Sequence, residues 1–323
     1  MSAPRKMVDQ AEDYLAFRRR LGYALVADGK ELMLFARHAD KIGHHRSVTK
    51  ELAIEWAKQP EGANPSYWAR RLHSVRQFTK YAALYDETTE IPPADAFGLM
   101  KRRPAPYIYS REQVGELLRA ASRLEPQDGL RSRTYVTLFG LLASTGLRIS
   151  EALALTPETV DLENGVLRLQ QTKFRKDRLV PVHPSTLQML QTYRRAAEDY
   201  HPNTGTDAFF LDENAGPLNY RGVLYRFVQL RKELGWSALP RSNESTGRPP
   251  RIHDLRHTFA VRRLLQWYRD GQSIEEHILY LSAYLGHACV SDTYWYLTAV
   301  PELMEPVSER FHTFVHAKGC EWS

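Results

Sequence analysis

The chain is organised around the stretch Ser144-Thr145-Gly146-Leu147-Arg148-Ile149-Ser150-Glu151-Ala152-Leu153. The Thr-Gly pair predicts a turn, after which Arg148 begins a helix that runs through Ser150 and Glu151. A guanidinium is planar and permanently charged, so it can bind two oxygens of a phosphodiester at once. Glu151, one turn along this helix, is placed to hold Arg148. The alternative is an ordinary arginine at a helix start, paired with a neighbouring glutamate.

Three later blocks add to this stretch: His253-Asp254-Leu255-Arg256-His257, then Leu285-Gly286-His287, and finally Tyr296. His253 and Arg256 are three residues apart, so on a helix they share a face. An imidazole there can donate to a phosphate or assist proton transfer. Each histidine alone is more often a structural residue, but the complete set in this order is hard to explain by packing. The set predicts cations that hold a phosphodiester while a phenolic oxygen attacks phosphorus.

The order and wording of these blocks resemble the tyrosine recombinase (phage integrase) family. The resemblance implies that Tyr296, nine residues after His287, is the nucleophile. Tyr294 is the rival, and on a helix two residues that far apart point in directions about 200° apart, so only one can face the phosphate. The resemblance also implies that a hairpin lysine is the general acid, either Lys173 or, in its place, Lys176. The implied catalytic set is Arg148, Lys173, His253, Arg256, His287 and Tyr296, with Glu151 in support.

The implied reaction is a pair of transesterifications through a 3′-phosphotyrosyl link, which conserves the bond energy. It therefore needs neither ATP nor a metal that activates the nucleophile. The sequence has no Walker-type Gly-Lys-Ser/Thr loop and no clustered carboxylates. His312, His316 and Cys320 have helical spacing, but no fourth ligand is evident. We expect no cofactor and no metal.

Composition favours a globular protein in a reducing compartment. Hydrophobic residues make up 43% and charged residues 25% of the chain. No run approaches the roughly 18 to 20 apolar residues of a membrane span, and two cysteines provide no disulfide framework. The net charge is +6, and residues 1–107 hold 18 lysines and arginines against 13 aspartates and glutamates. We expect a cytoplasmic protein with a polyanionic partner, associated with the nucleoid when bound to DNA.

Hydrophobic periodicity predicts a mainly α protein with a small antiparallel β-sheet, an α+β arrangement. The strands are expected at 160–162, 166–170 and 178–182, and helices before and after them. By resemblance, residues 1–90 form a helical core-binding (SAM-like) domain that clamps DNA. Residues 91–107 form a linker, in keeping with the four prolines in 86–107. Residues 108–323 form the catalytic domain with a tail helix.

One helix of the first domain offers a candidate DNA-binding face. Asn64-Pro65 opens a helix whose apolar stripe includes Trp68 and Phe78. Arginine, lysine and glutamine on the other side suit phosphate and base contacts, although a solvated helix face has the same composition. The candidate DNA-binding residues are Arg70, His73, Gln77 and Lys80 on this helix and Lys101, Arg102 and Arg103 in the linker.

The expected partner is double-stranded DNA with specific recombination sites, and no membrane. By resemblance we expect a homo-tetramer on DNA, and a monomer or weak oligomer when free. The segment 301–314 docks either on a neighbouring subunit or on its own domain. The first alternative to a recombinase is a non-cutting DNA-binding protein of the same fold, against which the complete catalytic set argues. The second is a type IB topoisomerase-like enzyme, which strand exchange between two sites would exclude.

Overall fold

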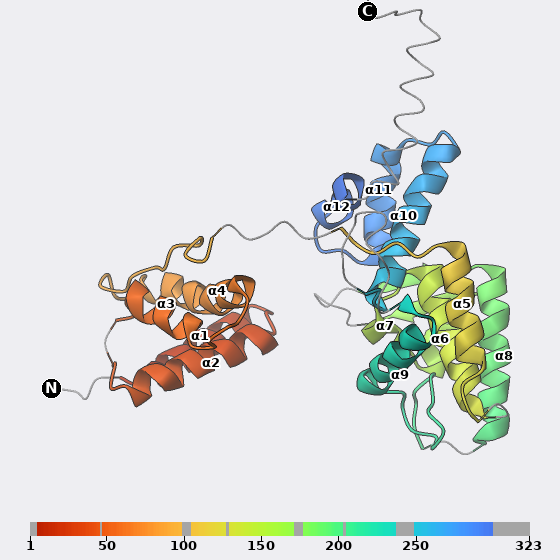
Figure 1. The fold of residues 1–323 in the computed structure, drawn as a ribbon, viewed down its shortest axis with the longest axis horizontal. Helices are drawn as coiled ribbons and strands as arrows, with labels where there is room; N and C mark the ends of the chain where they lie inside the picture. The colour runs from red at the N-terminus through yellow and green to blue at the C-terminus, as the bar shows by residue number, and fades with distance from the viewer. Residues whose placement is uncertain are drawn as a thin grey trace, which may run out of the picture. The chain divides into compact units, whose positions relative to one another are not determined.

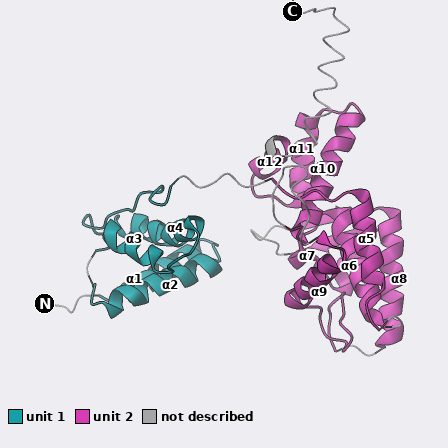
Figure 2. Ribbon diagram, viewed as in Figure 1, with its two compact units in different colours: residues 1–103 teal, residues 104–323 magenta. Residues whose placement is uncertain are grey.

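The computed structural model describes residues 5–45, 47–98, 105–126, 129–170, 177–202, 205–236 and 249–299. The fold is mainly helical with one three-stranded antiparallel sheet, as the sequence predicts (Figure 1). By their contacts, residues 1–103 and 104–323 form two compact units (Figure 2). Within the described ranges, no helix combines the length and apolar character needed to cross a bilayer.

The first unit is a four-helix bundle with its own apolar core. Side-chain caps start two of its helices: Thr49 Oγ1 accepts the Leu52 N–H at 3.3 Å, and Asn64 Oδ1 accepts the Ser66 N–H at 2.9 Å. Phe35 and Trp56 pack edge to face in the core, and Tyr14 contacts Phe78. The helices are α1 (Met7–Arg20), α2 (Val26–Lys41), α3 (Lys50–Lys58) and α4 (Pro65–Ala82).

The contacts of the first unit continue past residue 90. Ala96 and Phe97, inside the expected linker, pack against this core, and the Phe97 ring lies 5.8 Å from that of Trp68. The division by contacts falls between residues 103 and 104. The predicted DNA-binding residues Lys101, Arg102 and Arg103 lie outside the described residues.

The second unit is built around α6, a helix that is buried over most of its surface. Leu138, Phe139, Leu141 and Leu142 are all nearly inaccessible, as expected for a helix that is apolar on every side. It packs against α5, α8 and α10. It begins at Leu130, and its first turns carry buried Ser132 and Thr134 in place of an apolar stripe. The helices are α5 (Arg111–Ser122), α6 (Leu130–Thr145), α7 (Ile149–Leu153), η1 (Pro157–Thr159), α8 (Pro184–Tyr200) and α9 (Tyr220–Glu233).

The sheet follows α7 and η1 along the chain, and its strands lie in the order β1-β2-β3. In β2 and β3, Leu167 pairs with Val180 and Leu169 pairs with Arg178. Leu167, Leu169 and Val180 are buried in the core of the unit. The strands are β1 (Val160–Asp161), β2 (Val166–Leu169) and β3 (Arg178–Pro181).

The chain then forms a helical hairpin followed by a short helix: α10 (His253–Arg269), α11 (Ile274–Leu285) and α12 (Ser291–Ala299). A turn at Gly271 (φ +72°) joins α10 to α11. The start of α10 and the end of α11 meet, because Arg256 donates to the Leu285 carbonyl. Ala260, Val261, Leu264, Leu281, Leu285 and Tyr296 form a small core between the three helices. The predicted tail helix at 301–314, with His312, His316 and Cys320 in or after it, lies outside the described residues.

Candidate active site

Arg148 is positioned by a sharp change of direction between α6 and α7. Gly146 ends α6 in the left-handed region (φ +65°), where a Cβ would approach Phe259 to 2.5 Å. Arg148 is the N-cap of α7, and its Nη1 donates to Glu151 Oε1 at 2.7 Å. Its backbone N–H donates to the other carboxylate oxygen at 2.9 Å. Glu151 therefore contacts both the backbone and the side chain of Arg148, as the three-residue spacing suggests.

Arg178 is a member of this site that the sequence analysis missed. Its Nη2 donates to Glu151 Oε2 at 2.8 Å, and its Nε donates to the Tyr284 carbonyl at 2.9 Å. A signal was available: Arg178 pairs with buried Leu169 in the predicted sheet, and cross-strand partners point to the same face.

Glu151 serves as the counter-ion of two arginines. Its side chain is 6% exposed, and burial by itself raises the pKa of this carboxyl. Hydrogen bonds from Arg178 and Arg148, together with their charges, outweigh burial and hold the pKa of Glu151 below its ordinary value. The carboxylate is therefore ionised at neutral pH.

Arg256, in the first turn of α10, is almost completely buried. Its Nη1 donates to the Gly146 carbonyl at 2.8 Å and its Nη2 to the Leu285 carbonyl at 2.6 Å. Burial, followed by the positive charge of Arg148, lowers the pKa of Arg256 to about 10. The guanidinium remains charged at neutral pH.

The C-terminus of α11 gathers the three arginines. The Leu285 carbonyl accepts from both Arg148 and Arg256, the Gly286 carbonyl from Arg148, and the Tyr284 carbonyl from Arg178. The carbonyl end of a helix carries partial negative charge, which favours cations. Arg148, Arg178 and Arg256 with the carboxylate of Glu151, here called the arginine cluster, carry a net charge of +2.

The two tyrosines of α12 point in different directions, as predicted for residues two apart on a helix. Tyr294 is 45% exposed, whereas Tyr296 is 2% exposed and packs against α10. The hydroxyl of Tyr296 lies 2.8 Å from His257 Nδ1. Tyr296 is also close enough to Arg256 to interact with its charge. Of the two, Tyr296 is therefore the one beside the arginine cluster.

The two predicted histidines lie at the edges of this site. His253 is exposed, and its ring meets that of His257 edge to face at 4.7 Å. His287 directly follows Gly286, the αL cap of α11, and its Nδ1 lies 2.7 Å from Thr293 Oγ1 on α12. His287 thus connects the end of α11 to the helix that carries Tyr296.

A pocket of about 580 Å³ opens beside Arg148 and Glu151. It is lined by residues of α7, η1 and the end of β2, including Arg168 and Gln170. The segment 171–176 follows directly, so the predicted general acid Lys173 and its substitute Lys176 lie outside the described residues. In the part of the chain that the structure describes, no three His, Cys, Asp or Glu side chains gather as a metal site requires.

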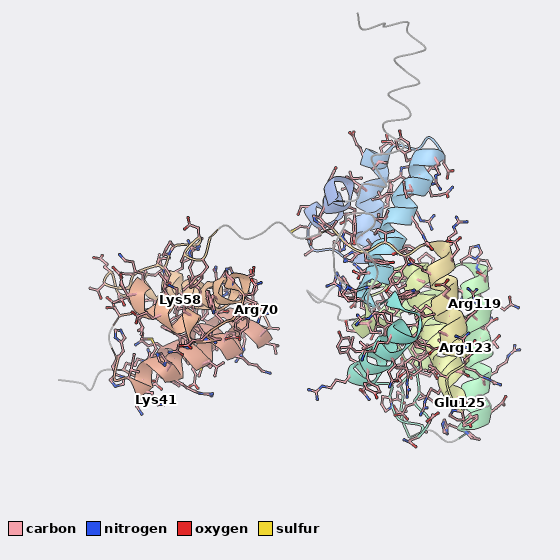
Figure 3. The ribbon with its side chains drawn as sticks, viewed as in Figure 1. Lys41, Lys58, Arg70, Arg119, Arg123 and Glu125 are labelled. Carbon is pink, nitrogen blue, oxygen red and sulfur yellow. The ribbon has the colours of Figure 1, made fainter. Side chains whose placement is uncertain are left out.

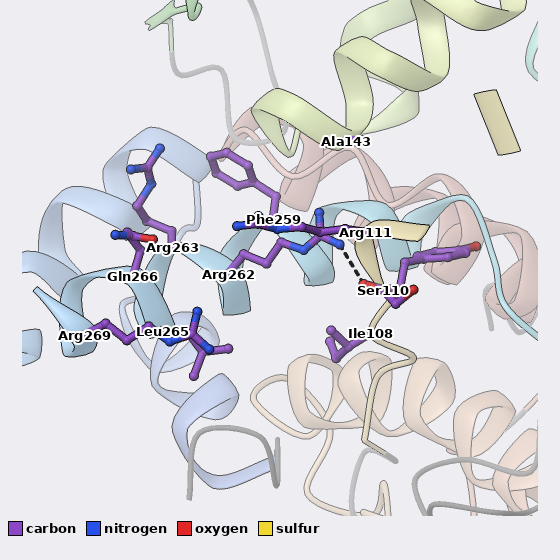
Figure 4. Close-up of a pocket in the computed structure, with 11 residues that line it drawn as sticks. Ile108, Ser110, Arg111, Ala143, Phe259, Arg262, Arg263, Leu265, Gln266 and Arg269 are labelled. Carbon is purple, nitrogen blue, oxygen red and sulfur yellow. Dashed lines mark hydrogen bonds between the residues drawn. The ribbon is translucent and has the colours of Figure 1, made fainter. Parts of the chain in front are cut away.

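A second pocket, of about 410 Å³, is lined by residues of α10, by residues 108–111 and by Ala143 (Figure 4). The lining combines arginines with apolar side chains such as Ile108 and Phe259, and Arg262 Nη2 donates to the Tyr109 carbonyl at 2.9 Å. Arg262 lies nine residues from His253, which is half a turn around the helix. No predicted catalytic residue lines this pocket, so it is separate from the candidate site. Its arginines are Arg111, Arg262, Arg263 and Arg269.

The candidate DNA-binding residues of α4 share one face of that helix. Arg70, His73 and Lys80 are exposed, and Gln77 is half-buried. Arg70 projects from α4 in Figure 3, whereas Lys41 lies at the end of α2. These side chains are accessible to a ligand of the first unit.

A family model described as the phage integrase family matches residues 109–302, which is more than half of the chain. The chain belongs to the phage integrase family. It is an enzyme of the tyrosine-type site-specific DNA recombinases, and the matched range contains the whole arginine cluster and Tyr296. The resemblance noted in the sequence is therefore confirmed at the level of the family.

Curated relatives of this recombinase extend over most of the chain. A Sinorhizobium fredii (strain NBRC 101917 / NGR234) protein named for integrase/recombinase activity, y4rB, is 38% identical over 305 residues, covering 93% of this chain and 95% of that protein. The tyrosine recombinase XerC of Chlamydia caviae is 30% identical over 245 residues, covering 75% of this chain and 70% of that protein.

Solved structures of integrases share the fold at low sequence identity. The Tn1549 transposon integrase, in complex with transposon right end DNA, has a TM-score of 0.64 at 17% identity, covering 94% of this recombinase and 100% of that chain. Lambda integrase, in a tetramer bound to a Holliday junction, has a TM-score of 0.56 at 17% identity, covering 88% and 76%. These likenesses show the fold of this recombinase.

Proposed function

We propose that this recombinase belongs to a mobile element and cuts and rejoins DNA through a 3′-phosphotyrosyl intermediate. The observation that carries the proposal is the arginine cluster, with a net charge of +2, beside the buried hydroxyl of Tyr296. Excess positive charge in a buried site stabilises the charge that develops on a phosphodiester under attack.

Arg148 and Arg256 are the proposed phosphate ligands. Each guanidinium has five N–H donors, and the contacts to Glu151, Gly146 and the end of α11 use only some of them. The remaining donors are available to the non-bridging oxygens. Glu151 and Arg178 act indirectly: they do not bind the phosphate but fix the position of Arg148.

Tyr296 is the proposed nucleophile. Its oxygen forms a bond to phosphorus while the bond from phosphorus to the 5′-oxygen breaks, which leaves a 3′-phosphotyrosyl link. Lys173 is the proposed acid that protonates the departing 5′-oxygen. A 5′-hydroxyl from a partner strand then attacks the link and releases Tyr296. His253 and His287 are the proposed additional donors around the phosphate.

The relatives support DNA as the partner and a mobile element as the context. The Tn1549 integrase is a transposon protein in complex with transposon DNA, and the lambda integrase structure is a tetramer on a Holliday junction. We extend to this chain a double-stranded DNA substrate with specific sites and a tetramer on that DNA. Residues 1–90 are the proposed DNA clamp, with Arg70, His73, Gln77 and Lys80 facing the duplex.

The test is covalent trapping on nicked DNA. A binding site is first selected from a random-sequence library with the full chain, and a nick beside the cleavage position then prevents religation. Wild type should form a 3′-linked adduct in the presence of a metal chelator. Tyr296→Phe should form none, and Tyr294→Phe, its neighbour on the exposed side of α12, should form adduct normally.

Two results would contradict the proposal. An adduct that disappears only in Tyr294→Phe would move the nucleophile to the other tyrosine. Tight binding to the selected site without any adduct in wild type would favour a non-cutting DNA-binding protein.

A further inference from the structure

His257 and Tyr296 form a buried pair between α10 and α12. The distance from His257 Nδ1 to the Tyr296 hydroxyl is 2.8 Å, and both side chains are 2% exposed. The rings of Trp295 and His253 also contact the His257 ring. Bulk water does not reach this hydroxyl, so a proton that leaves it must pass to a protein group or to the substrate.

Which group donates in this contact depends on the tautomer of His257, and the tautomer that suits a base is the one that accepts at Nδ1. A phenol donates its O–H readily, and Nδ1 can accept only when it carries no proton, which places the ring proton of the neutral imidazole on Nε2. The neutral ring is the form that a base requires.

Building on the proposed function, we infer that His257 is the general base for Tyr296. As the phenolic oxygen forms its bond to phosphorus, the O–H bond breaks and the proton passes to Nδ1 of His257. The electron pair of the breaking P–O bond leaves with the 5′-oxygen, which takes its proton from the general acid. In the second step the imidazolium returns its proton to the oxygen of Tyr296 as the link is broken.

This assignment separates the roles of two neighbouring histidines. His253 and Arg256 were grouped from their spacing, and His253 is the exposed member of the histidine pair. His257 lies within hydrogen-bonding distance of the oxygen that reacts, whereas His253 packs against its ring. A base must first be within reach of the proton that it removes. By that criterion His257 holds the position of the base.

The decisive variant is His257→Asn. The amide oxygen of asparagine can occupy the place of Nδ1 and accept the same hydrogen bond, but it cannot take the proton. His257→Ala removes both the contact and the base. The full chain is used on the nicked, selected duplex, and the rate of adduct formation is measured with an ordinary 5′-oxygen leaving group and with a bridging 5′-sulfur. A sulfur leaving group departs without taking up a proton. It therefore restores the cleavage rate of a variant that lacks the general acid, but not that of a variant that lacks the base.

We expect His257→Asn to form adduct about 100-fold to 10,000-fold more slowly than wild type, with DNA affinity and melting temperature close to those of wild type. The defect should be as large with the sulfur leaving group. His257→Ala should be no faster. If His257→Ala does not fold, His257→Asn decides the matter.

Two outcomes overturn the inference while leaving the proposed function intact. Adduct formation by His257→Asn at the wild-type rate would mean that the contact only positions Tyr296. A defect that disappears with the sulfur leaving group would place His257 on the acid side of the reaction. The proposed function fails separately, when wild type itself forms no adduct or when Tyr296→Phe still forms one.

Discussion

Charge balance decides the chemistry at the scale of single residues. The arginine cluster contains three guanidinium groups and one carboxylate, which pairs with Arg148 and Arg178, so the cluster keeps a net charge of +2. Glu151 is the only acidic member, and without it Arg148 and Arg178 would repel each other. Glu151 therefore sets the positions of Arg148 and Arg178 relative to each other.

The contribution of Glu151 to stability should depend on pH. The pKa of Glu151 in the folded protein is below its ordinary value of 4.5, so its contribution is complete above that value and disappears as the pH falls through the folded-state pKa. Glu151→Gln should lower the free energy of unfolding by up to about 3–5 kcal/mol at neutral pH. The difference in melting temperature between wild type and the variant should shrink below about pH 4.5.

The control for this measurement is Glu163→Gln, which changes an exposed glutamate in the turn between β1 and β2. It should leave the melting temperature nearly unchanged at every pH. A difference between wild type and Glu151→Gln that did not shrink as the pH fell below about 4.5 would contradict the ion-pair account.

Arg256→Lys tests whether a positive charge at this position is sufficient for DNA cleavage. Lysine keeps the charge but cannot reach the Gly146 and Leu285 carbonyls together and still present a planar fork to a phosphate. We expect the rate of adduct formation to fall about 100-fold to 1,000-fold, with DNA binding changed only a few-fold. Arg262→Lys, on the same helix but outside the candidate site, is the matched control and should cleave normally.

At the scale of elements, the end of α11 holds the site together. Its last carbonyls accept from all three arginines, and Gly286 (φ +66°) ends the helix where a Cβ would lie 2.5 Å from Arg178 Nη1. A side chain at this position is opposed twice, by the left-handed backbone and by Arg178. The glycine of the Leu-Gly-His block is therefore required by the site as well as by the helix cap.

Gly286→Ala and Gly271→Ala separate these two effects. Both glycines have positive φ, so both substitutions should cost about 1–2 kcal/mol of stability. A Cβ at Gly271 meets nothing within 4 Å, whereas one at Gly286 displaces Arg178. The melting temperature of Gly286→Ala should fall at least as much as that of Gly271→Ala. Only Gly286→Ala should slow adduct formation, by at least 10-fold. Equal cleavage by the two variants would show that Arg178 is dispensable.

Local signals predicted the elements well and the contacts between elements less well. The caps at Thr49, Asn64 and Ser110 and the left-handed Gly146 follow from the residues alone, because capping is a local interaction. Arg178 was missed because its partners lie on α7 and α11. The pairing of His257 with Tyr296 was missed for the same reason: 39 residues separate the two, and only packing brings α12 onto α10.

At the scale of the whole molecule, the chain has two separate cores, and each unit can contribute its own surface to a ligand. The candidate clamp face on α4 consists of Arg70, Lys80, His73 and Gln77, which suits contact with phosphates more than chemistry. Binding through such a face should depend strongly on salt, because each neutralised phosphate releases counterions.

Arg70→Ala combined with Lys80→Ala tests this face. If both side chains neutralise phosphates, the slope of log affinity against log salt concentration should become less steep by about 1.8, measured by fluorescence anisotropy on the selected duplex. Lys41→Ala combined with Lys58→Ala removes the same charge from exposed positions on α2 and α3 (Figure 3). Equal changes in slope for the two double variants would mean that net charge, and not the α4 face, governs binding.

The hairpin of α10 and α11 gives the chain room to change length. Arg256 and Leu285 meet at one end of the hairpin, while the connecting turn at residues 270–273 lies at the other end. Matched extension of both helices would move the turn outward and leave the reactive groups in place. The 29-residue separation between Arg256 and Leu285 could thus change without disturbing their contact. The same turn is a suitable place to graft a peptide tag or a reporter domain while retaining catalysis.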